Sequence, residues 1–483
     1  MKKEALILTT DKFRSQLRQE AEVWRREGLI NDLQHEQLSQ RYQFDTLDTS
    51  SRNRFVMVLI GLGCILIGLG VITFVAANWQ ELSRTFKVLL LLSLFISINI
   101  AGFYIWRKPS DSSQRLGNGL LILGALILGA NMALMGQIYH INEPFYKLML
   151  AWGVGVLAMA YSLRLTSLSL IAIILLWIGQ WGFAIDSIFD SSWLYQRLTW
   201  SSLLGEYMPI FACIIFIPLA YLCKSRWVFA FGAIAIVSAL IGNLYFYSYG
   251  IGRLFNLSTI QISGWAIALF FALPPILLWS YDDFRGNIAI SKSFRAISQN
   301  LALIYLAGVF YSFSFYSLWA NWSREPLDTD LSRVNLFPLI SLLFLIIIGI
   351  WQWVHLGKRM TRHRPIQSQD LTTIVVGLLI VIPVLISIWH THVAPIPELA
   401  TFAFNALLFI LSIGLMREGL THGQRRAFWF GLLLLILRIL NWFFLSNTGL
   451  FFKSLVFVLC GVGVIAIGLW FEKYVRTFGN TSN

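Results

Sequence analysis

Blocks of about twenty apolar residues recur along almost the whole chain, and they constrain the fold more than any other feature. A helix needs about 20 apolar residues to cross the roughly 30 Å hydrocarbon core of a bilayer. Unbroken apolarity favours helices over membrane β-strands, which are about 10 residues long and alternate apolar with polar side chains. The sequence therefore predicts an all-α, polytopic transmembrane helical bundle.

Fourteen blocks reach the length of a membrane span. They are residues 55–77, 86–106, 118–138, 145–163, 165–184, 207–223, 227–246, 260–280, 297–319, 336–356, 373–391, 399–416, 427–446 and 450–472. The turns at Arg164 and at residues 224–226 are very short, so we expect about 12 to 15 spans in all. Apolar residues make up 57% of the chain and charged residues 13%, which excludes a soluble protein of 483 residues.

The first 54 residues are polar and charged, and a helical hairpin is expected there. Thr9, Thr10 and Asp11 can cap a helix that runs to Gly28, and a second short helix follows from about Asp32. One face of the first helix carries Phe13, Leu17, Ala21 and Trp24. We therefore expect a cytoplasmic domain at 1–54, the bundle at 55–472 and a cytoplasmic tail at 473–483. The hairpin either covers the bundle or binds a protein partner.

The net charge of +13 is distributed unevenly between the two sets of connecting segments. Segments on the side of the N-terminus hold 20 Lys and Arg residues, whereas those on the opposite side hold 8. This asymmetry is the positive-inside bias, so both termini are expected in the cytoplasm. The basic charge then faces anionic lipid, and we expect the lipid bilayer, not nucleic acid, as its partner.

Two glycine-containing stretches 400 positions apart are nearly the same. Residues 58–69 (VLIGLGCILIGL) and 458–469 (VLCGVGVIAIGL) agree at eight of twelve positions. The shared glycines are Gly61, Gly63 and Gly68 in the first stretch and Gly461, Gly463 and Gly468 in the second. A further similarity joins residues 62–70 to 123–131, which contain Gly124 and Gly129. Close helix packing and the inverted repeats of a transporter both explain such glycines.

Arg438 is the most informative polar residue, because it lies near the middle of the span 427–446. A central arginine costs about 2.5–3.5 kcal/mol on insertion scales, so it usually faces the bundle interior. Asn441 lies one turn further along the same face. The candidate counter-charges are Glu398, Glu206, Asp186 and Glu143. Arg438 is either an anion-binding or ion-coupling group in a cavity, or a structural residue that is paired or reaches the interface.

Other polar residues in the apolar blocks are weaker candidates. Asn131, Gln137 and His140 could line a crevice, or could only form interhelical hydrogen bonds. His390 and His392 have no third ligand at a fixed spacing, so we predict no metal site. Three prolines are expected to break or kink their helices, and the freed carbonyls could line a cavity. They are Pro274, Pro275 and Pro383.

Three stretches resemble the DUF2157 family of predicted bacterial membrane proteins. They are FRSQLRQEAEVWRREGLINDLQHEQLSQRY, LIGLGCILIGLGVITFVAANW and GLLILGALILGANMALMGQIYHI. The resemblance covers residues 10–180 and is looser beyond them. It implies a multi-pass protein of the bacterial plasma membrane, and it transfers no activity and no catalytic residue.

Motifs of soluble enzymes, such as a Walker A loop, GxSxG or HExxH, do not occur, and we expect neither a cofactor nor catalytic residues. The span number, the buried arginine and the glycine repeats favour a secondary transporter or flippase-like carrier of a small anionic or lipid ligand. One alternative is a scaffold or sensor that acts through residues 1–54. Another is a transferase that uses a lipid-linked substrate, which a cluster of Glu81, Glu143, Glu206 and Glu398 would favour.

Overall fold

The described part of the chain is helical throughout. The computed structural model describes residues 11–42, 44, 83–189, 199–282, 294–320, 336–362, 368–421 and 424–445, with isolated positions in 59–73 and 451–468. Helices account for all regular structure in these ranges, and no strand occurs in them. The predicted all-α class is therefore confirmed. The chain forms two compact units, Met1–Asn142 and Glu143–Asn483.

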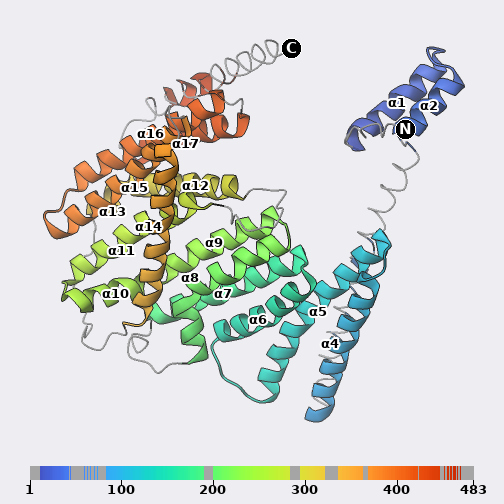
Figure 1. Ribbon diagram of the computed structural model, residues 1–483, viewed down its shortest axis with the longest axis horizontal. Helices are drawn as coiled ribbons and strands as arrows, with labels where there is room; N and C mark the ends of the chain where they lie inside the picture. The colour runs from blue at the N-terminus through green and yellow to red at the C-terminus, as the bar shows by residue number, and fades with distance from the viewer. Residues whose placement is uncertain are drawn as a thin grey trace. The chain divides into compact units, whose positions relative to one another are not determined.

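The first unit contains two helical hairpins (Figure 1). Its helices are α1 (Asp11–Arg26), α2 (Asp32–Tyr42), α4 (Arg84–Trp106) and α5 (Asp111–Ile138). α1 and α2 turn at Gly28, whose φ of 73° suits glycine. Ala21 is fully buried against the half-buried Leu17, Trp24 and Leu38, so the predicted apolar face is the one that packs. The cytoplasmic location of this hairpin stays a prediction.

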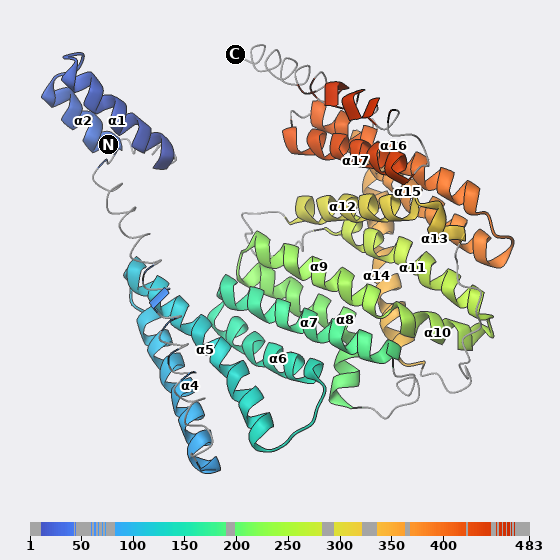
Figure 2. The same ribbon diagram turned by 180° about the vertical axis from the view of Figure 1, so that it is seen from behind.

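The second unit contains twelve described helices. They are α6 (Phe145–Leu163), α7 (Thr166–Phe189), α8 (Trp200–Leu222), α9 (Arg226–Gly242), α10 (Leu244–Phe255), α11 (Thr259–Ser280), α12 (Arg295–Phe313), α13 (Tyr316–Ala320), α14 (Pro338–Arg362), α15 (Ser368–His392), α16 (Pro397–Thr421) and α17 (Arg425–Leu445). α7 packs against α6 and α9, α11 packs against α12, α14 and α15, and α16 packs against α12 and α17 (Figure 2).

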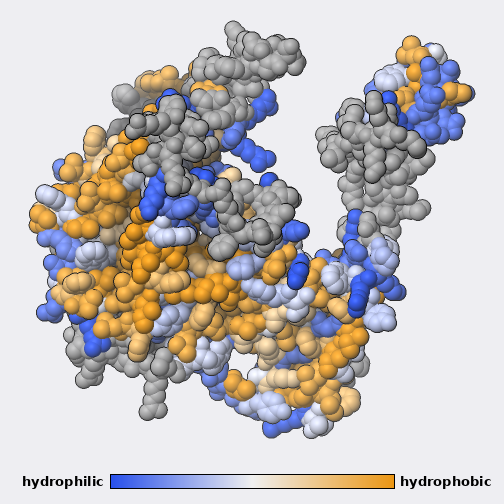
Figure 3. Space-filling view, viewed as in Figure 1, coloured by the Kyte–Doolittle hydropathy of each residue, from blue (hydrophilic) through white to orange (hydrophobic). Residues whose placement is uncertain are grey.

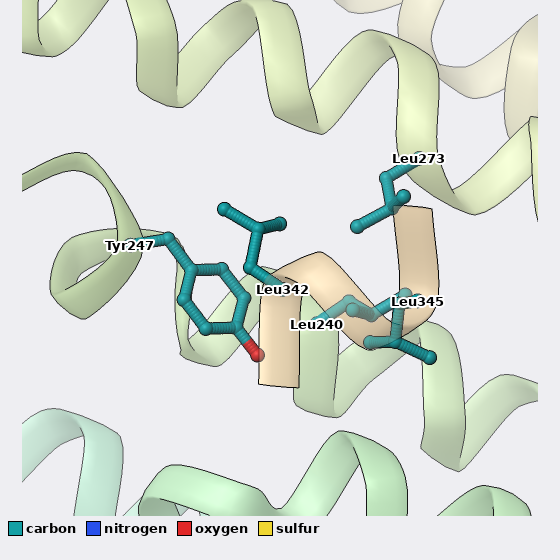
Figure 4. Close-up of a cluster of buried hydrophobic side chains, with 5 residues drawn as sticks. All are labelled: Leu240, Tyr247, Leu273, Leu342 and Leu345. Carbon is teal, nitrogen blue, oxygen red and sulfur yellow. The ribbon is translucent and has the colours of Figure 1, made fainter. Parts of the chain in front are cut away.

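Apolar side chains lie both inside and outside this helical assembly. One buried cluster brings together side chains from four helices (Figure 4). They are Leu240 of α9, Tyr247 of α10, Leu273 of α11, and Leu342 and Leu345 of α14. The visible surface of the second unit is also widely hydrophobic (Figure 3). Along α14, for example, Leu343, Ile347, Ile350 and Trp351 are exposed. A surface of this kind needs lipid around it, which fits an integral membrane protein.

Ten of the described helices are long and apolar enough to cross a membrane, and an eleventh results if α9 and α10 form one bent span. The predicted number of fourteen is therefore not confirmed. The expected spans 55–77 and 450–472 lie almost wholly outside the described residues, so both stay predictions. α17 coincides with the expected span 427–446 but is not among those ten.

Two predicted spans are broken helices. Residues 297–319 were expected to form one helix, but α12 ends at Phe313 and α13 starts at Tyr316. Residues 227–246 form α9 only as far as Gly242, and α10 follows at an angle of 43°. Most of residues 247–259, which lie between two of the expected spans, belong to α10.

The three prolines do not break their helices, whereas a kink at these positions stays a prediction. α11 continues through Pro274 and Pro275, and α15 continues through Pro383. Proline removes the N–H that would bond the carbonyl four residues earlier. For Pro274 that carbonyl belongs to Phe270, and the Tyr305 hydroxyl of α12 donates to it across 2.7 Å. A neighbouring helix thus supplies the missing donor, and this carbonyl is not left to line a cavity.

Candidate functional site

The end of α12 presents backbone carbonyls to side chains from other helices. The last carbonyls of a helix have no N–H partner within it. Ser314 Oγ donates to the Tyr311 carbonyl across 2.7 Å, and Trp319 Nε1 donates to the Phe313 carbonyl across 2.8 Å. These side-chain bonds stabilise the break between α12 and α13. The Ser314 carbonyl itself is bonded from α16 and α17.

Arg438 of α17 is the cation at this break. Its Nη2 donates to the Ser314 carbonyl across 3.0 Å, and its Nε donates to Asn405 Oδ1 across 2.6 Å. The guanidinium carbon lies 5.0 Å from the centre of the Phe315 ring, in cation–π range. Only 7% of the residue is exposed. A positive charge at the C-terminus of a helix is favoured by the helix dipole.

The orientation of Asn405 follows from its other contacts. Its Nδ2 donates to the Thr401 carbonyl across 2.7 Å and to the Ser314 carbonyl across 3.2 Å. Since a carbonyl oxygen can only accept a hydrogen bond, the amide nitrogen of Asn405, and not its oxygen, must face these two carbonyls. Asn405 Oδ1 therefore faces Arg438, and the side chain links α16, α17 and the end of α12.

Asn441 lies one turn after Arg438 and contacts the same end of α12. Its Nδ2 donates to the Tyr311 hydroxyl across 2.6 Å. The Tyr311 ring also meets the Phe315 ring edge-on, with centroids 5.6 Å apart. The two predicted α17 residues therefore share one face, and both face the break in α12.

No carboxylate pairs with Arg438 in the described part of the chain. Of the predicted counter-charges, Glu398 is exposed at the start of α16, and Glu143 pairs with Lys147. Within the described residues, the hydrogen bonds to Asn405 and Ser314 use two of the five N–H donors of the guanidinium. Its hydrogen-bond partners among the described residues are neutral, so within that part of the chain the charge is balanced by dipoles and by an aromatic ring.

Most of the partners of Arg438 are not among the residues predicted from the sequence. Asn405 is a single amide within the apolar span 399–416. A lone amide in an apolar span is the feature of the sequence that could have identified this partner. Ser314, Tyr311 and Phe315 offer no such feature, because nothing in the local sequence shows that α12 ends there.

Aromatic side chains enclose the site on the side of α13. Trp319 is 2% exposed, and its ring lies 5.3 Å from Phe404 and 5.1 Å from His390. His390 Nδ1 accepts a hydrogen bond from the Ile396 N–H across 3.0 Å, so this histidine stabilises the turn between α15 and α16. Within the described residues, no three His, Cys, Asp or Glu side chains are placed to hold a metal ion.

The four acids that would favour a transferase are not seen as a cluster. Glu206 is buried in α8, Glu398 is exposed on α16, and Glu143 bonds to Lys147. Glu81 lies outside the described residues. The structure therefore gives this alternative no specific support.

The remaining predicted site residues belong to the first unit. Asn131 is 4% exposed on α5, and its Nδ2 donates to the Leu91 carbonyl of α4 across 3.0 Å. Gln137 and His140 are exposed, and His140 has a φ of 52° just beyond α5. Asn131 thus joins α4 to α5, as expected for an interhelical amide, and it does not share a buried face with the other two.

The packing glycines differ in their surroundings. A Cβ on Gly124 would come within 2.5 Å of the Asn99 side chain, and one on Gly468 would come within 3.2 Å of the Trp429 ring. Gly129 is buried in α5. Within the described surroundings, a Cβ on Gly63, Gly461 or Gly463 would meet nothing within 4 Å. Gly61 and Gly68 lie outside the described residues, so a packing role for these five stays a prediction.

The helices and their apolar surfaces define an integral membrane protein with many spans. Residues 22–169 match the family model described as a predicted membrane protein, DUF2157, so the resemblance is confirmed over those residues. An 81-residue stretch is 26% identical to the probable 4-amino-4-deoxy-L-arabinose-phosphoundecaprenol flippase subunit ArnE of Klebsiella pneumoniae (strain 342). That stretch is 17% of this chain and 71% of the relative. No solved structure matches.

Proposed function

We propose that this protein is a membrane carrier, of the secondary-transporter or flippase type, that binds an anionic group at Arg438. The observation that carries the proposal is the buried guanidinium at a helix break, whose hydrogen-bond partners in the described residues are an amide and a carbonyl. Broken helices with exposed backbone groups form the substrate sites of many carriers. Charged residues within membrane spans commonly mark such pathways.

Charge balance supports an anionic ligand. A buried charge is costly unless another charge and good hydrogen bonds compensate it. Guanidinium groups bind carboxylate and phosphate oxygens through paired N–H donors. Arg438 keeps donors beyond the two used by Asn405 and Ser314. An oxyanion would use them and neutralise the site.

The weak similarity to ArnE suggests which anion to test first. That relative is named for a lipid with a phosphate in its linkage. We therefore propose a phosphate-bearing ligand, either a lipid head group or a small soluble phosphate ester. The similarity to DUF2157 supports a bacterial plasma membrane location. The excess of Lys and Arg on one side supports a cytoplasmic location of both termini.

Native mass spectrometry of the full chain, purified from its own membrane, tests this proposal. We expect the wild type to retain a phosphate-bearing molecule that Arg438→Leu loses. Arg426→Leu is the matched control, because it removes one positive charge from an exposed position at the start of the same helix. Equal retention by wild type and Arg438→Leu, or no bound phosphate compound in either, would contradict the proposal.

The N-terminal hairpin supports a second candidate, a scaffold or sensor that binds a protein partner through residues 1–54. Leu29 and Leu33 are 67% and 66% exposed, although Ala21 and Phe44 form a core beside them. The charge-introducing change Leu33→Asp would leave that core intact. If this candidate is right, the change removes a partner found by crosslinking in cells, and transport-related phenotypes stay normal.

A further inference from the structure

The short turns that join α6 to α7 and α8 to α9 lie at the same end of these four helices. Near the start of α7, Ser169 Oγ lies 3.3 Å from Cys223 Sγ, just after α8. Further along, Trp177 of α7 donates a hydrogen bond to Ser238 of α9. α7 and α9 therefore lie side by side (Figure 2) and run in the same direction, which brings the turns before them together.

The start of α12 lies at this end too. The ring of Phe294, which directly precedes α12, stacks on Phe229 in the first turn of α9, with centroids 4.8 Å apart. It also meets the ring of Tyr221, in the last turn of α8, at 5.0 Å. Three segments of the chain that are distant in sequence thus meet at one end of the helices.

Each of these segments carries cations at positions that the local backbone disfavours. Arg164 and Lys224 have φ angles of 54° and 47°, a conformation that favours glycine. Arg226 and Arg295 are the first residues of α9 and α12, where the helix dipole opposes a positive charge. We call these four residues the basic cluster. Local helix preferences do not explain why all four are cations.

The basic cluster is open to its surroundings. Arg164, Lys224 and Arg226 are exposed, and Arg295 is half-buried. None of the four forms an ion pair with a carboxylate in the described part of the chain. Asp282 also lies near this end, because the preceding Tyr281 hydroxyl is 2.6 Å from that of Tyr221. One carboxylate beside four cations leaves the cluster with a net positive charge.

Apolar side chains that face outward begin beside the basic cluster. Trp227 follows Arg226 and is 68% exposed, as is common for tryptophan at a membrane interface. Phe211, Ile214 and Leu222 are exposed on one face of α8, which ends at the cluster. A ligand with a negative group and long apolar chains matches both surfaces, whereas a soluble anion matches only the first.

We propose that the basic cluster binds the head group of an anionic phospholipid, whose acyl chains lie along the exposed face of α8. Basic pockets between membrane helices bind such head groups through their phosphates. The lipid phosphate supplies the negative charge that the cluster lacks. The proposal does not rest on the function proposed for Arg438.

Thermal unfolding of the full-length protein in lipid–detergent micelles tests this proposal, with either phosphatidylglycerol or phosphatidylcholine as the lipid. A ligand that binds only the folded state raises Tm, so we expect a higher Tm in phosphatidylglycerol. Arg164→Gly and Lys224→Gly should each reduce this difference, and the double variant should abolish it. In phosphatidylcholine, Tm should not fall, because glycine suits a positive φ. Cations that act only on the helix ends would instead lower Tm equally in both lipids.

Three control variants should keep the full difference between the two lipids. Asn256→Gly makes the same backbone change at a φ of 53° without loss of charge. Arg426→Leu removes an exposed cation from the start of α17, and Arg438→Gln changes the site of the proposed function.

The proposal is overturned if the wild type has the same Tm in both lipids, or if the double glycine variant keeps the difference. An equal loss in Arg426→Leu also overturns it, because the attraction would then be a property of the whole basic surface. So does an equal stabilisation by soluble glycerol phosphate, since the acyl chains would then contribute nothing. Loss of a bound compound in Arg438→Leu is a separate readout, so either proposal can fail without the other.

Discussion

The Nε atom of Arg438 donates to Asn405 Oδ1 across 2.6 Å, and this hydrogen bond joins α17 to α16 at the end of α12. Asn405 is held in position by the Thr401 and Ser314 carbonyls. The guanidinium is thus placed by neutral groups. Under the proposed function, the site is ordered before the ligand arrives, and the charge of the guanidinium remains to bind it.

Substituting Asn405 separates a binding role of Arg438 from a structural one. Asn405→Asp places a carboxylate beside the guanidinium, so the charge is balanced within the chain and the phosphate ligand should be lost. Asn405→Leu leaves a buried N–H donor unsatisfied, which should lower the free energy of unfolding by about 1–3 kcal/mol. Native mass spectrometry and chemical denaturation measure the two effects. Undiminished ligand retention in Asn405→Asp would argue against a free positive charge at the site.

Tyr305 should matter only because Pro274 is present. Tyr305→Phe leaves the Phe270 carbonyl without a donor and should cost about 1–3 kcal/mol of stability. In a Pro274→Ala background, the alanine N–H can bond to that carbonyl, so the same change should cost much less. A double-mutant cycle measures this coupling. Additive effects of the two substitutions would show that the hydroxyl does not replace the missing donor.

Asn441 and Tyr311 should act as a pair. Asn441→Leu and Tyr311→Phe each remove the 2.6 Å bond between Asn441 Nδ2 and the Tyr311 hydroxyl. Each change should lower the free energy of unfolding by about 1 kcal/mol. The double variant should lose less than the sum, because only one bond is removed. Full additivity in denaturant titrations would contradict a direct contact.

Two glycines of α16 provide a matched test of the α16–α17 contact that positions Arg438. A Cβ on Gly419 would come within 2.6 Å of the Phe428 backbone nitrogen, whereas one on Gly414 would meet nothing within 4 Å in the described surroundings. Gly419→Ala should therefore cost about 1–3 kcal/mol through overpacking. Gly414→Ala should be neutral or stabilising by up to about 1 kcal/mol, because alanine favours a helix. Equal Tm values for the two variants would contradict this packing.

Helix positions could be predicted wherever an apolar block is long enough to span a bilayer. Each predicted span from residue 86 to residue 446 coincides with a described helix or with a broken pair. The breaks could not be predicted in the same way. The stretch YSFSFYSLW around Ser314 contains no proline or glycine, and the end of α12 is stabilised by Arg438 and Asn405, which are distant in sequence.

The candidate site was predictable only in part. A central arginine is costly in any span, so Arg438 was identified by its position alone, and Asn441 followed from helical spacing. Acidic partners were expected, because a buried charge usually has a counter-charge. The groups that accept hydrogen bonds from Arg438 are the Asn405 amide and the Ser314 carbonyl at the end of α12. Neither group is charged, so the charged residues of the sequence do not point to them.

A lipid translocation assay tests the central claim most directly. Proteoliposomes would contain a polyprenyl-phosphate lipid with a fluorescent head group, and dithionite would quench the label in the outer leaflet only. With wild-type protein and the Arg426→Leu control, we expect the quenched fraction to exceed that of protein-free vesicles. With Arg438→Leu, at equal protein incorporation, it should fall to the protein-free value. Translocation that is equal in wild type and Arg438→Leu, or absent in both, would contradict a carrier that binds a phosphate-bearing lipid at Arg438.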